Sequence, residues 1–258
     1  MKTKWAIGLI SIAVVLVAVA AWWANNSSKD VNPGAGAEYN LVNPGKLTIV
    51  SSGGFVPFTD MENGKMVGYD IDVGTEIAKI LGLEPKFEKA DFSGMITGIQ
   101  TGRYDIAINS HTITDERKKQ VSFTQPYYYS GSMIFSAPGS SIKTVDDLNG
   151  ATVALNRSSN YYVEAQAYTN KFDFYDDDLR ALQAVAEGHG DAGITDAISG
   201  QQAVANGLKL EAQQQFSKTE QAIPMAKENE KLLKAINEAM DELKSNGKLK
   251  ELSIKWIG

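Results

Sequence analysis

The sequence predicts an α/β fold of two lobes, each a mixed sheet flanked by helices, joined by two hinge crossings. From Leu47 onward, short apolar strands alternate with helical stretches, an order typical of a sheet of parallel strands covered by helices. The alternation begins again at Met133, which indicates a second unit. A strand at 222–226 could return to the first unit. We therefore expect the crossings near Ser136 and near Ser217.

The chain divides into four segments. Residues 25–46 are rich in Asn, Ser, Pro and Gly, a composition typical of a flexible tether. The predicted segments are a signal peptide or N-terminal membrane anchor at 1–24, the tether at 25–46, a first lobe at 47–136 plus 217–258, and a second lobe at 137–216.

The N-terminus is typical of an exported protein. Lys2 and Lys4 precede a charge-free apolar run at 6–24, as in a secretory signal. The run is also long enough to span a bilayer, and Trp22 and Trp23 resemble an interfacial anchor. A cleaved signal and a retained anchor both remain open. Either way we expect the periplasm or the outer face of the cytoplasmic membrane, with membrane contact through this segment alone.

Composition excludes several classes of function. The net charge of -6 argues against a nucleic-acid partner, because phosphate binding needs a basic face. The absence of cysteine excludes disulfides, thiolate metal sites and cysteine nucleophiles. His111 and His189 are too few for a histidine-rich metal site, and the common nucleotide, zinc-protease and serine-hydrolase motifs are absent. We predict no cofactor, no metal and no enzymatic activity.

The first unit contains three strands and two helices before the chain leaves it. They are expected as strands at 47–50, 86–89 and 105–109, with helices at 73–81 and 95–101. A Ser-Ser-Gly-Gly loop follows the first strand, where backbone can approach a ligand closely. Parallel sheets bind ligands beyond the carboxyl ends of their strands. The loops after these strands are therefore the candidate rim.

The second unit repeats this organisation, and the chain then ends in two helices. Strands are expected at 133–136, 152–156, 191–196 and 208–211, with helices from Tyr161 and at 179–186 and 197–206. Apolar stripes in the region 232–256 are explained by core packing.

The stretch 105–117 carries the clearest signal for a ligand. Thr114 reads as the N-cap of a helix, and Arg117 falls in its first turn, where a cation meets the positive end of the helix dipole. An anion would compensate for this, and a guanidinium pairs best with a carboxylate. The alternative is that Asp115 or Glu116 neutralises Arg117 on a solvated surface.

Asp196 and His111 are two further candidates. Asp196 ends an apolar strand, and a carboxylate there facing Arg117 across a cleft would match a zwitterion. The alternative for Asp196 is a helix N-cap, and one residue can serve both roles. His111 could donate to a ligand or act as a base, or it packs behind the loop as a satisfied polar residue.

Five short motifs carry a resemblance to a known family. They lie at 55–58 (FVPF), 68–72 (GYDID), 91–94 (DFSG), 112–117 (TITDER) and 191–196 (DAGITD). From about Leu47 to Gly258 the chain resembles the periplasmic polar-amino-acid-binding proteins of ABC importers, solute-binding protein family 3, and is most similar to the glutamine-binding type. The resemblance implies the type II periplasmic-binding-protein fold.

The resemblance also implies roles for individual residues. The matching Arg117 clamps the ligand α-carboxylate, Asp196 holds the α-ammonium, and Phe55 and Phe92 sandwich the side chain. The whole expected site comprises Ser52, Phe55, Phe92, Asn109, Ser110, Thr112, Arg117, Asn156, Ser159, Asn160 and Asp196.

Departures from the family pattern bear on specificity. Ser52 stands where glutamine and basic-amino-acid binders place an acid, which disfavours a cationic ligand most. Asn156 and Thr195 replace a Lys and a His of the glutamine-binding type, and His111 occupies a usually apolar position. Arg157 near the cleft leaves an acidic amino acid open.

The predicted function is capture of a free polar amino acid, as a zwitterion, between the two lobes for ABC-type import. The expected partner is a membrane ABC permease, and we expect a monomer. One alternative is an enzyme on the same scaffold resembling cyclohexadienyl dehydratase, with His111 as the base. Another is a membrane-tethered amino-acid sensor domain.

Overall fold

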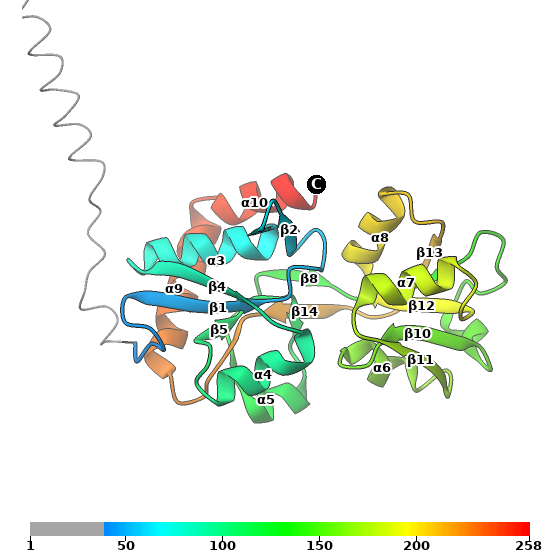
Figure 1. Cartoon of the computed structure of the whole chain (residues 1–258), viewed down its shortest axis with the longest axis horizontal. Helices are drawn as coiled ribbons and strands as arrows, with labels where there is room; N and C mark the ends of the chain where they lie inside the picture. Colours follow the sequence, from blue (N-terminus) through cyan, green and yellow to red (C-terminus); the bar gives the residue numbers. More distant parts are fainter. Residues whose placement is uncertain (1–38) are drawn as a thin grey trace, which may run out of the picture.

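A computed structural model describes residues 39–258, which form two lobes side by side (Figure 1). The predicted signal or anchor at 1–24 and the first part of the predicted tether lie outside the described residues. In the described part of the chain, no helix is long and apolar enough to cross a membrane.

The last residues of the predicted tether are packed onto the first lobe. Tyr39 and Leu41 contact its core, and the backbone N–H of Val42 donates to Asp105 at 2.8 Å. The second carboxylate oxygen of Asp105 accepts from the N–H of Thr48 at 2.7 Å. Asp105 thus joins the incoming chain to the first strand, and the packed part begins before Leu47.

The sheet of the first lobe is mixed, as expected. Its order is β4 (Glu84–Lys89), β1 (Lys46–Ser51), β5 (Ile106–Ala107), β15 (Pro224–Met225) and β7 (Ser122–Phe123). The first three strands run parallel, and β15 returns antiparallel beside β5. The predicted return of the chain to this lobe is confirmed, with a shorter strand than the sequence suggests.

Five helices belong to the first lobe and surround this sheet (Figure 1). They are α3 (Tyr69–Ile80), α4 (Phe92–Gln100), α5 (Asp115–Gln120), α9 (Glu230–Ser245) and α10 (Lys248–Trp256). The apolar stripe of α9 is buried together with the inner face of α3, which confirms the core-packing interpretation. A hairpin of β2 (Asp60–Glu62) and β3 (Lys65–Val67) precedes α3.

Two strands cross between the lobes beside each other. β14 (Thr219–Ala222) pairs with β8 (Tyr128–Ser130) and with β6 (His111–Thr112). At the crossing, the N–H of Ser132 donates to the hydroxyl of Ser217 at 2.8 Å. A side chain on Gly131 would collide with the carbonyl of Ser217.

The first crossing lies at Gly131 rather than near Ser136. β9 (Ser132–Ser136) is fully buried between β12 and β13 in the sheet of the second lobe. The predicted boundary after residue 136 includes these residues in the first lobe, although the strand pattern at 133–136 indicates the start of the second unit. An apolar strand that follows a hinge can join either sheet, and only its pairing partners decide which.

The sheet of the second lobe is also mixed. Its order is β11 (Lys171–Tyr175), β10 (Thr152–Asn156), β12 (Ala192–Asp196), β9 and β13 (Glu211–Gln215). Its helices are η1 (Val145–Leu148), α6 (Asn160–Ala165), α7 (Asp178–Ala186) and α8 (Ala197–Ala205). β13 starts at Glu211 and not at 208, because the chain is still turning after Gly207, with Leu210 N–H bonded to the Leu208 carbonyl.

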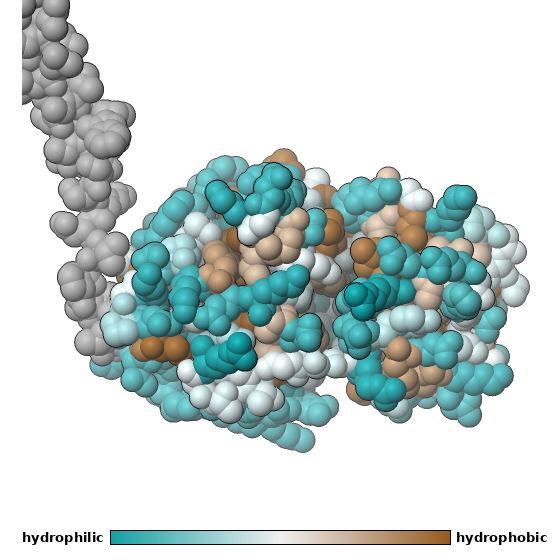
Figure 2. Space-filling model, viewed as in Figure 1, coloured by the Kyte–Doolittle hydropathy of each residue, from teal (hydrophilic) through white to brown (hydrophobic). Residues whose placement is uncertain are grey.

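The carboxyl ends of the parallel strands face each other across the junction of the lobes. β1 and β4 end there in the first lobe, and β10 and β11 end there in the second. Figure 2 shows a hollow where the two lobes meet. The topology therefore places the predicted rim loops around one cleft.

Candidate functional site

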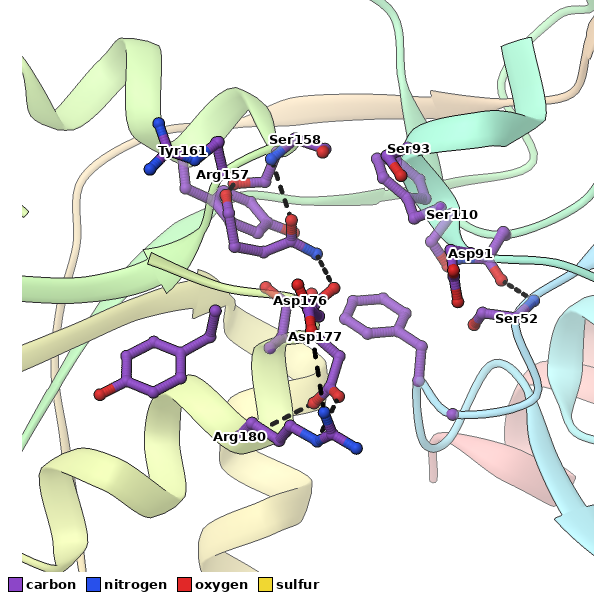
Figure 3. Close-up of a pocket in the computed structure, with 18 of the residues that line it drawn as sticks. Ser52, Asp91, Ser93, Ser110, Arg157, Ser158, Tyr161, Asp176, Asp177 and Arg180 are labelled. Atoms are coloured by element: carbon purple, nitrogen blue, oxygen red, sulfur yellow. Dashed lines mark hydrogen bonds and ion pairs between the residues drawn. The ribbon is translucent and has the colours of Figure 1, made fainter. Parts of the chain in front are cut away.

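A cavity of about 680 Å³ lies between the lobes and is the candidate site. Segments 52–55, 91–93 and 109–110 line it from the first lobe. Segments 156–161 and 174–178 line it from the second. In Figure 3 Ser52, Asp91, Ser93 and Ser110 lie opposite Arg157, Tyr161, Asp176 and Asp177. The volume of this cavity lies within the usual range for small-molecule sites.

Most of the residues predicted for the site line this cavity. They are Ser52, Phe55, Phe92, Asn109, Ser110, Asn156, Ser159 and Asn160. Thr112, Arg117 and Asp196 do not line it and lie behind its walls.

Asn109 joins two of the rim loops of the first lobe. Its buried side-chain oxygen accepts from the N–H of Ser52 at 2.7 Å and from the hydroxyl of Ser51 at 3.1 Å. The hydroxyl of Ser51 also bonds to Thr59. These bonds hold the loop after β1 against the loop after β5.

Ser110 is held in an unusual backbone conformation by a buried acid. Its backbone φ angle is 54°, a value that residues other than glycine rarely adopt. Its N–H and hydroxyl donate to Asp70 at 2.8 and 3.1 Å. The other oxygen of Asp70 accepts from the hydroxyl of Tyr127 at 2.7 Å. Asp70 therefore fixes the loop that presents Ser110 to the cavity.

The environment of Asp70 favours its protonated form. Burial raises the pKa of the Asp70 carboxyl to about 7, although the hydrogen bonds from Tyr127 and Ser110 oppose the shift. Asp70 was not among the predicted site residues. The available signal was its place in the GYDID motif, at the buried side of the first turn of α3.

Arg117 lies directly behind the first-lobe wall. Thr114 caps α5 and accepts from the N–H of Arg117 at 3.2 Å, as predicted. Arg117 is 9% exposed, and its guanidinium carbon lies 5.3 Å from the ring centre of Phe92. Nη1 donates to the carbonyl of Thr112 at 3.0 Å, and Nη2 donates across the cleft to the carbonyl of Ser158 at 3.3 Å. Arg117 is thus buried against the cleft, not on a solvated surface.

His111 packs behind Phe92 and away from the cavity. The two rings stack with centres 4.6 Å apart, and His111 is 1% exposed. Neither ring nitrogen has a hydrogen-bond partner among the described residues. Burial, followed by the charge of Arg117, lowers the pKa of His111 well below its usual value. The lowered pKa makes His111 a weak base, and His111 does not line the cavity that a substrate would enter; both facts disfavour the role of catalytic base.

Asp196 caps a helix, which was the alternative interpretation. Its carboxylate accepts from the N–H groups of Ile198 and Ser199 at 2.9 and 3.2 Å, at the start of α8. Burial raises the pKa of Asp196 to about 6. Burial, reinforced by the charge of Asp196, raises the pKa of the cavity-lining Tyr161 and Asp178, and Asp196 therefore lies close behind the second-lobe wall.

The loop of the second lobe at 156–160 is stabilised by its own hydrogen bonds. The side-chain oxygen of Asn156 accepts from the N–H of Ser158 at 2.9 Å, and the hydroxyl of Ser159 donates to the Asn156 carbonyl at 2.7 Å. Asn160 donates to Glu164 at 2.7 Å. The loop is therefore pre-shaped at the mouth of the cleft.

Sequence reasoning missed most of the second-lobe wall. Phe174, Tyr175 and the acids at 176–178 line the cavity, and the guanidinium of Arg157 stacks 3.6 Å from the centre of the Phe174 ring. The run of acids at 176–178 was not among the residues predicted for the site. Only the parallel pairing of β11 with β10 shows that it meets the rim.

The described residues offer no obvious metal site. Among residues 39–258, no group of three or more His, Asp or Glu side chains is placed to hold a metal ion. What the cleft offers is a buried guanidinium on one side, buried carboxylates on the other, aromatic rings and many hydroxyl and amide donors. Such a set suits a small molecule that carries both charges.

The chain has relatives among known proteins. Residues 47–258 match the family of bacterial extracellular solute-binding proteins, family 3. The L-cystine-binding protein TcyJ of Escherichia coli strain K12 is 34% identical over 83% of this chain and 83% of its own. The probable amino-acid-binding protein YxeM of Bacillus subtilis strain 168 is 34% identical over 98% of this chain and 95% of its own.

A solved structure agrees with these matches. An ancestral arginine-binding protein bound to arginine has 35% sequence identity and a TM-score of 0.78, over 83% of this chain and 99% of that chain. The predicted type II periplasmic-binding-protein-like fold is thereby confirmed.

Proposed function

We propose that this chain, which belongs to the bacterial extracellular solute-binding proteins of family 3, captures a free polar amino acid in the cleft between its lobes. The relatives named above are binding proteins, which confirms the prediction that the chain is not an enzyme. Two of them are described as binding cystine and arginine, and both ligands carry the α-amino-acid head group.

The observation that carries the proposal is the position of Arg117 between the lobes. Its guanidinium is bonded to the Thr112 carbonyl in the first lobe and to the Ser158 carbonyl in the second. A guanidinium has five N–H donors, so donors remain for a ligand carboxylate. A charge buried this deeply needs a counter-charge, and a carboxylate supplies it.

The other groups complete an amino-acid site. In our proposal Ser110, Thr112, Ser159 and Asn160 assist Arg117 at the α-carboxylate, while Asp196 holds the α-ammonium. Phe55 and Phe92 form the apolar walls, and Ser52, Asn109 and Asn156 contact the variable part of the ligand. Binding across both lobes stabilises the closed arrangement, and an ABC permease recognises that arrangement.

The protein works outside the cytoplasm, as its family does. We propose that it acts as a monomer in the periplasm or at the outer face of the cytoplasmic membrane, with an ABC permease as its partner. Relatives are named as binding proteins of amino-acid ABC transporters, which supports this partner.

The proposal is tested in two steps. A thermal-shift screen of the twenty amino acids identifies the ligand, because a molecule that binds only the folded state raises the melting temperature. The same ligand with its α-carboxylate converted to an amide should give no shift, because the guanidinium then lacks its counter-charge.

Calorimetry of Arg117→Ala tests the residue directly. Loss of two charge-assisted hydrogen bonds is expected to weaken binding by about 100-fold or more. Arg103→Ala is the matched control, because Arg103 stacks on Tyr104 and does not line the cavity. Unchanged affinity in Arg117→Ala would remove Arg117 from the site.

A further inference from the structure

Three consecutive acids face the cleft at the start of α7, and only two of them are paired. Arg180 contacts Asp177 at 3.2 Å and Asp176 at 3.9 Å. Within 39–258, Asp178 has no ion pair with any Lys, Arg or His. The hydroxyl of Thr195 donates a hydrogen bond to the Asp178 carboxylate at 2.9 Å.

Asp178 lies at the junction of two cavities. It lines the main cavity and also a second, more apolar one of about 380 Å³, lined by Leu179 and Leu182 of α7. Phe55 of the first lobe lines both cavities as well. A ligand side chain that extends from the main cavity toward the second one therefore comes near Phe55 and Asp178, which line both.

The carboxylate is ionised at neutral pH. Burial raises the pKa of Asp178 to about 6, an effect that the hydrogen bonds from Thr195 and Asn156 oppose and the charge of Asp196 reinforces. Above this pH a partly buried negative charge is stabilised by a cation in contact with it. An ionised carboxylate only accepts hydrogen bonds, so its partner must be a donor.

Two of the cations that line the cleft are engaged elsewhere. Arg180 pairs with the two preceding acids, and Arg157 lies flat on Phe174. Lys89 lines the opposite wall of the cavity, beside Gly53. None of these side chains forms an ion pair with Asp178.

We propose that Asp178 recognises the end of the ligand side chain and selects an amino acid with a second cationic group. The inference rests on the proposed function, because the head group must be held by Arg117 for the side chain to reach Asp178. It revises the expectation from Ser52. The acid missing from the first lobe at that position is supplied by the second lobe, from Asp178 at the start of α7.

Matched ligands test the inference without any mutation. L-Arginine and L-citrulline have the same length and nearly the same shape, but only arginine carries a cationic end. Calorimetry at pH 8 should show arginine binding about 10-fold or more tightly than citrulline, because a charge-assisted hydrogen bond is replaced by a neutral one. L-Glutamate should bind more weakly than L-glutamine, because its carboxylate would face Asp178.

Asp178→Asn should then reduce the preference for arginine over citrulline to about threefold or less, with citrulline affinity nearly unchanged. The amide can still accept from Thr195, so the melting temperature is expected to stay near that of the wild type. The control is Asp173→Asn, an exposed acid of β11 outside the cavity, which should leave the preference intact.

The outcomes separate this inference from the proposed function. Equal affinity of the wild type for arginine and citrulline overturns the role of Asp178, and so does tightest binding of an amino acid without a cationic side chain. In both cases amino-acid capture still stands. Failure of every amino acid to bind overturns the proposed function as well.

Discussion

Asp70 couples the binding loop to pH. In the unfolded chain an aspartate titrates near pH 4, whereas burial raises the pKa of Asp70 to about 7 in the folded protein. Between these values the folded state binds the extra proton, so the contribution of Asp70 to stability falls as the pH rises through this window. Asp178 and Asp196, with pKa values raised to about 6, act in the same direction.

Asp70→Asn isolates this effect, because the amide resembles the protonated acid and can keep the bonds to Ser110 and Tyr127. Its melting temperature should exceed that of the wild type by more at pH 8 than at pH 5, and the increase should be several degrees for a difference on the order of 1–3 kcal/mol. The control is Asp72→Asn, on the same helix, whose carboxylate is paired with Lys255 at 2.7 Å. That variant should gain no stability at pH 8. A constant difference between Asp70→Asn and the wild type from pH 5 to 8 would contradict the account.

Individual residues were predictable where their type conflicted with their position. Arg117 stood out because a cation in the first turn of a helix is electrostatically misplaced. Asp70 and Asp178 did not, since an acid in a first turn is what the helix dipole favours, and such residues usually face solvent. Their burial follows from the packing of α3 on its sheet and of α7 at the rim, which no local pattern reveals.

Helix α5 holds Arg117 in place through its cap. The helix spans only Asp115–Gln120, so the bond from the N–H of Arg117 to Thr114 is a large part of its support. Thr114→Ala is expected to cost about 1 kcal/mol. Because Arg117 moves with the helix, ligand affinity should weaken by about fivefold.

A second threonine provides the control for the cap. Thr144 caps η1 in the second lobe and bonds reciprocally with Asp147. Thr144→Ala also removes a capping hydroxyl, but at a helix that does not line the cavity. It should therefore lower the melting temperature without changing the ligand affinity. Equal affinity of both variants and the wild type would show that the cap does not position the guanidinium.

Element type was predictable from periodicity, and element ends were not. The apolar stripe of α9 and the Thr114 cap of α5 were both predicted from the sequence, and the structure shows both. β13 starts later than expected and β5 pairs over two residues only, because strand ends depend on partners distant in the sequence. The same limit explains why the lobe boundary was predicted after residue 136 and not before β9.

The two-lobed architecture follows from the repeated alternation of strands and helices, and the cleft follows from the direction of the parallel strands. What the sequence could not give was how the lobes meet. Arg117 reaches the Ser158 carbonyl, and the hydroxyl of Ser199 donates to the Val56 carbonyl at 2.7 Å. These bonds join the lobes at the cleft, while β8 and β14 join them at the hinge.

Small-angle X-ray scattering with and without the amino acid found by the thermal-shift screen tests the central claim most directly. A ligand that bridges Arg117 and the second lobe shifts the population toward the closed arrangement. The radius of gyration of the wild type should therefore decrease at saturation, and that of Arg117→Ala should not change at the same ligand concentration. A ligand that binds the wild type tightly and leaves its radius of gyration unchanged would contradict capture between hinged lobes.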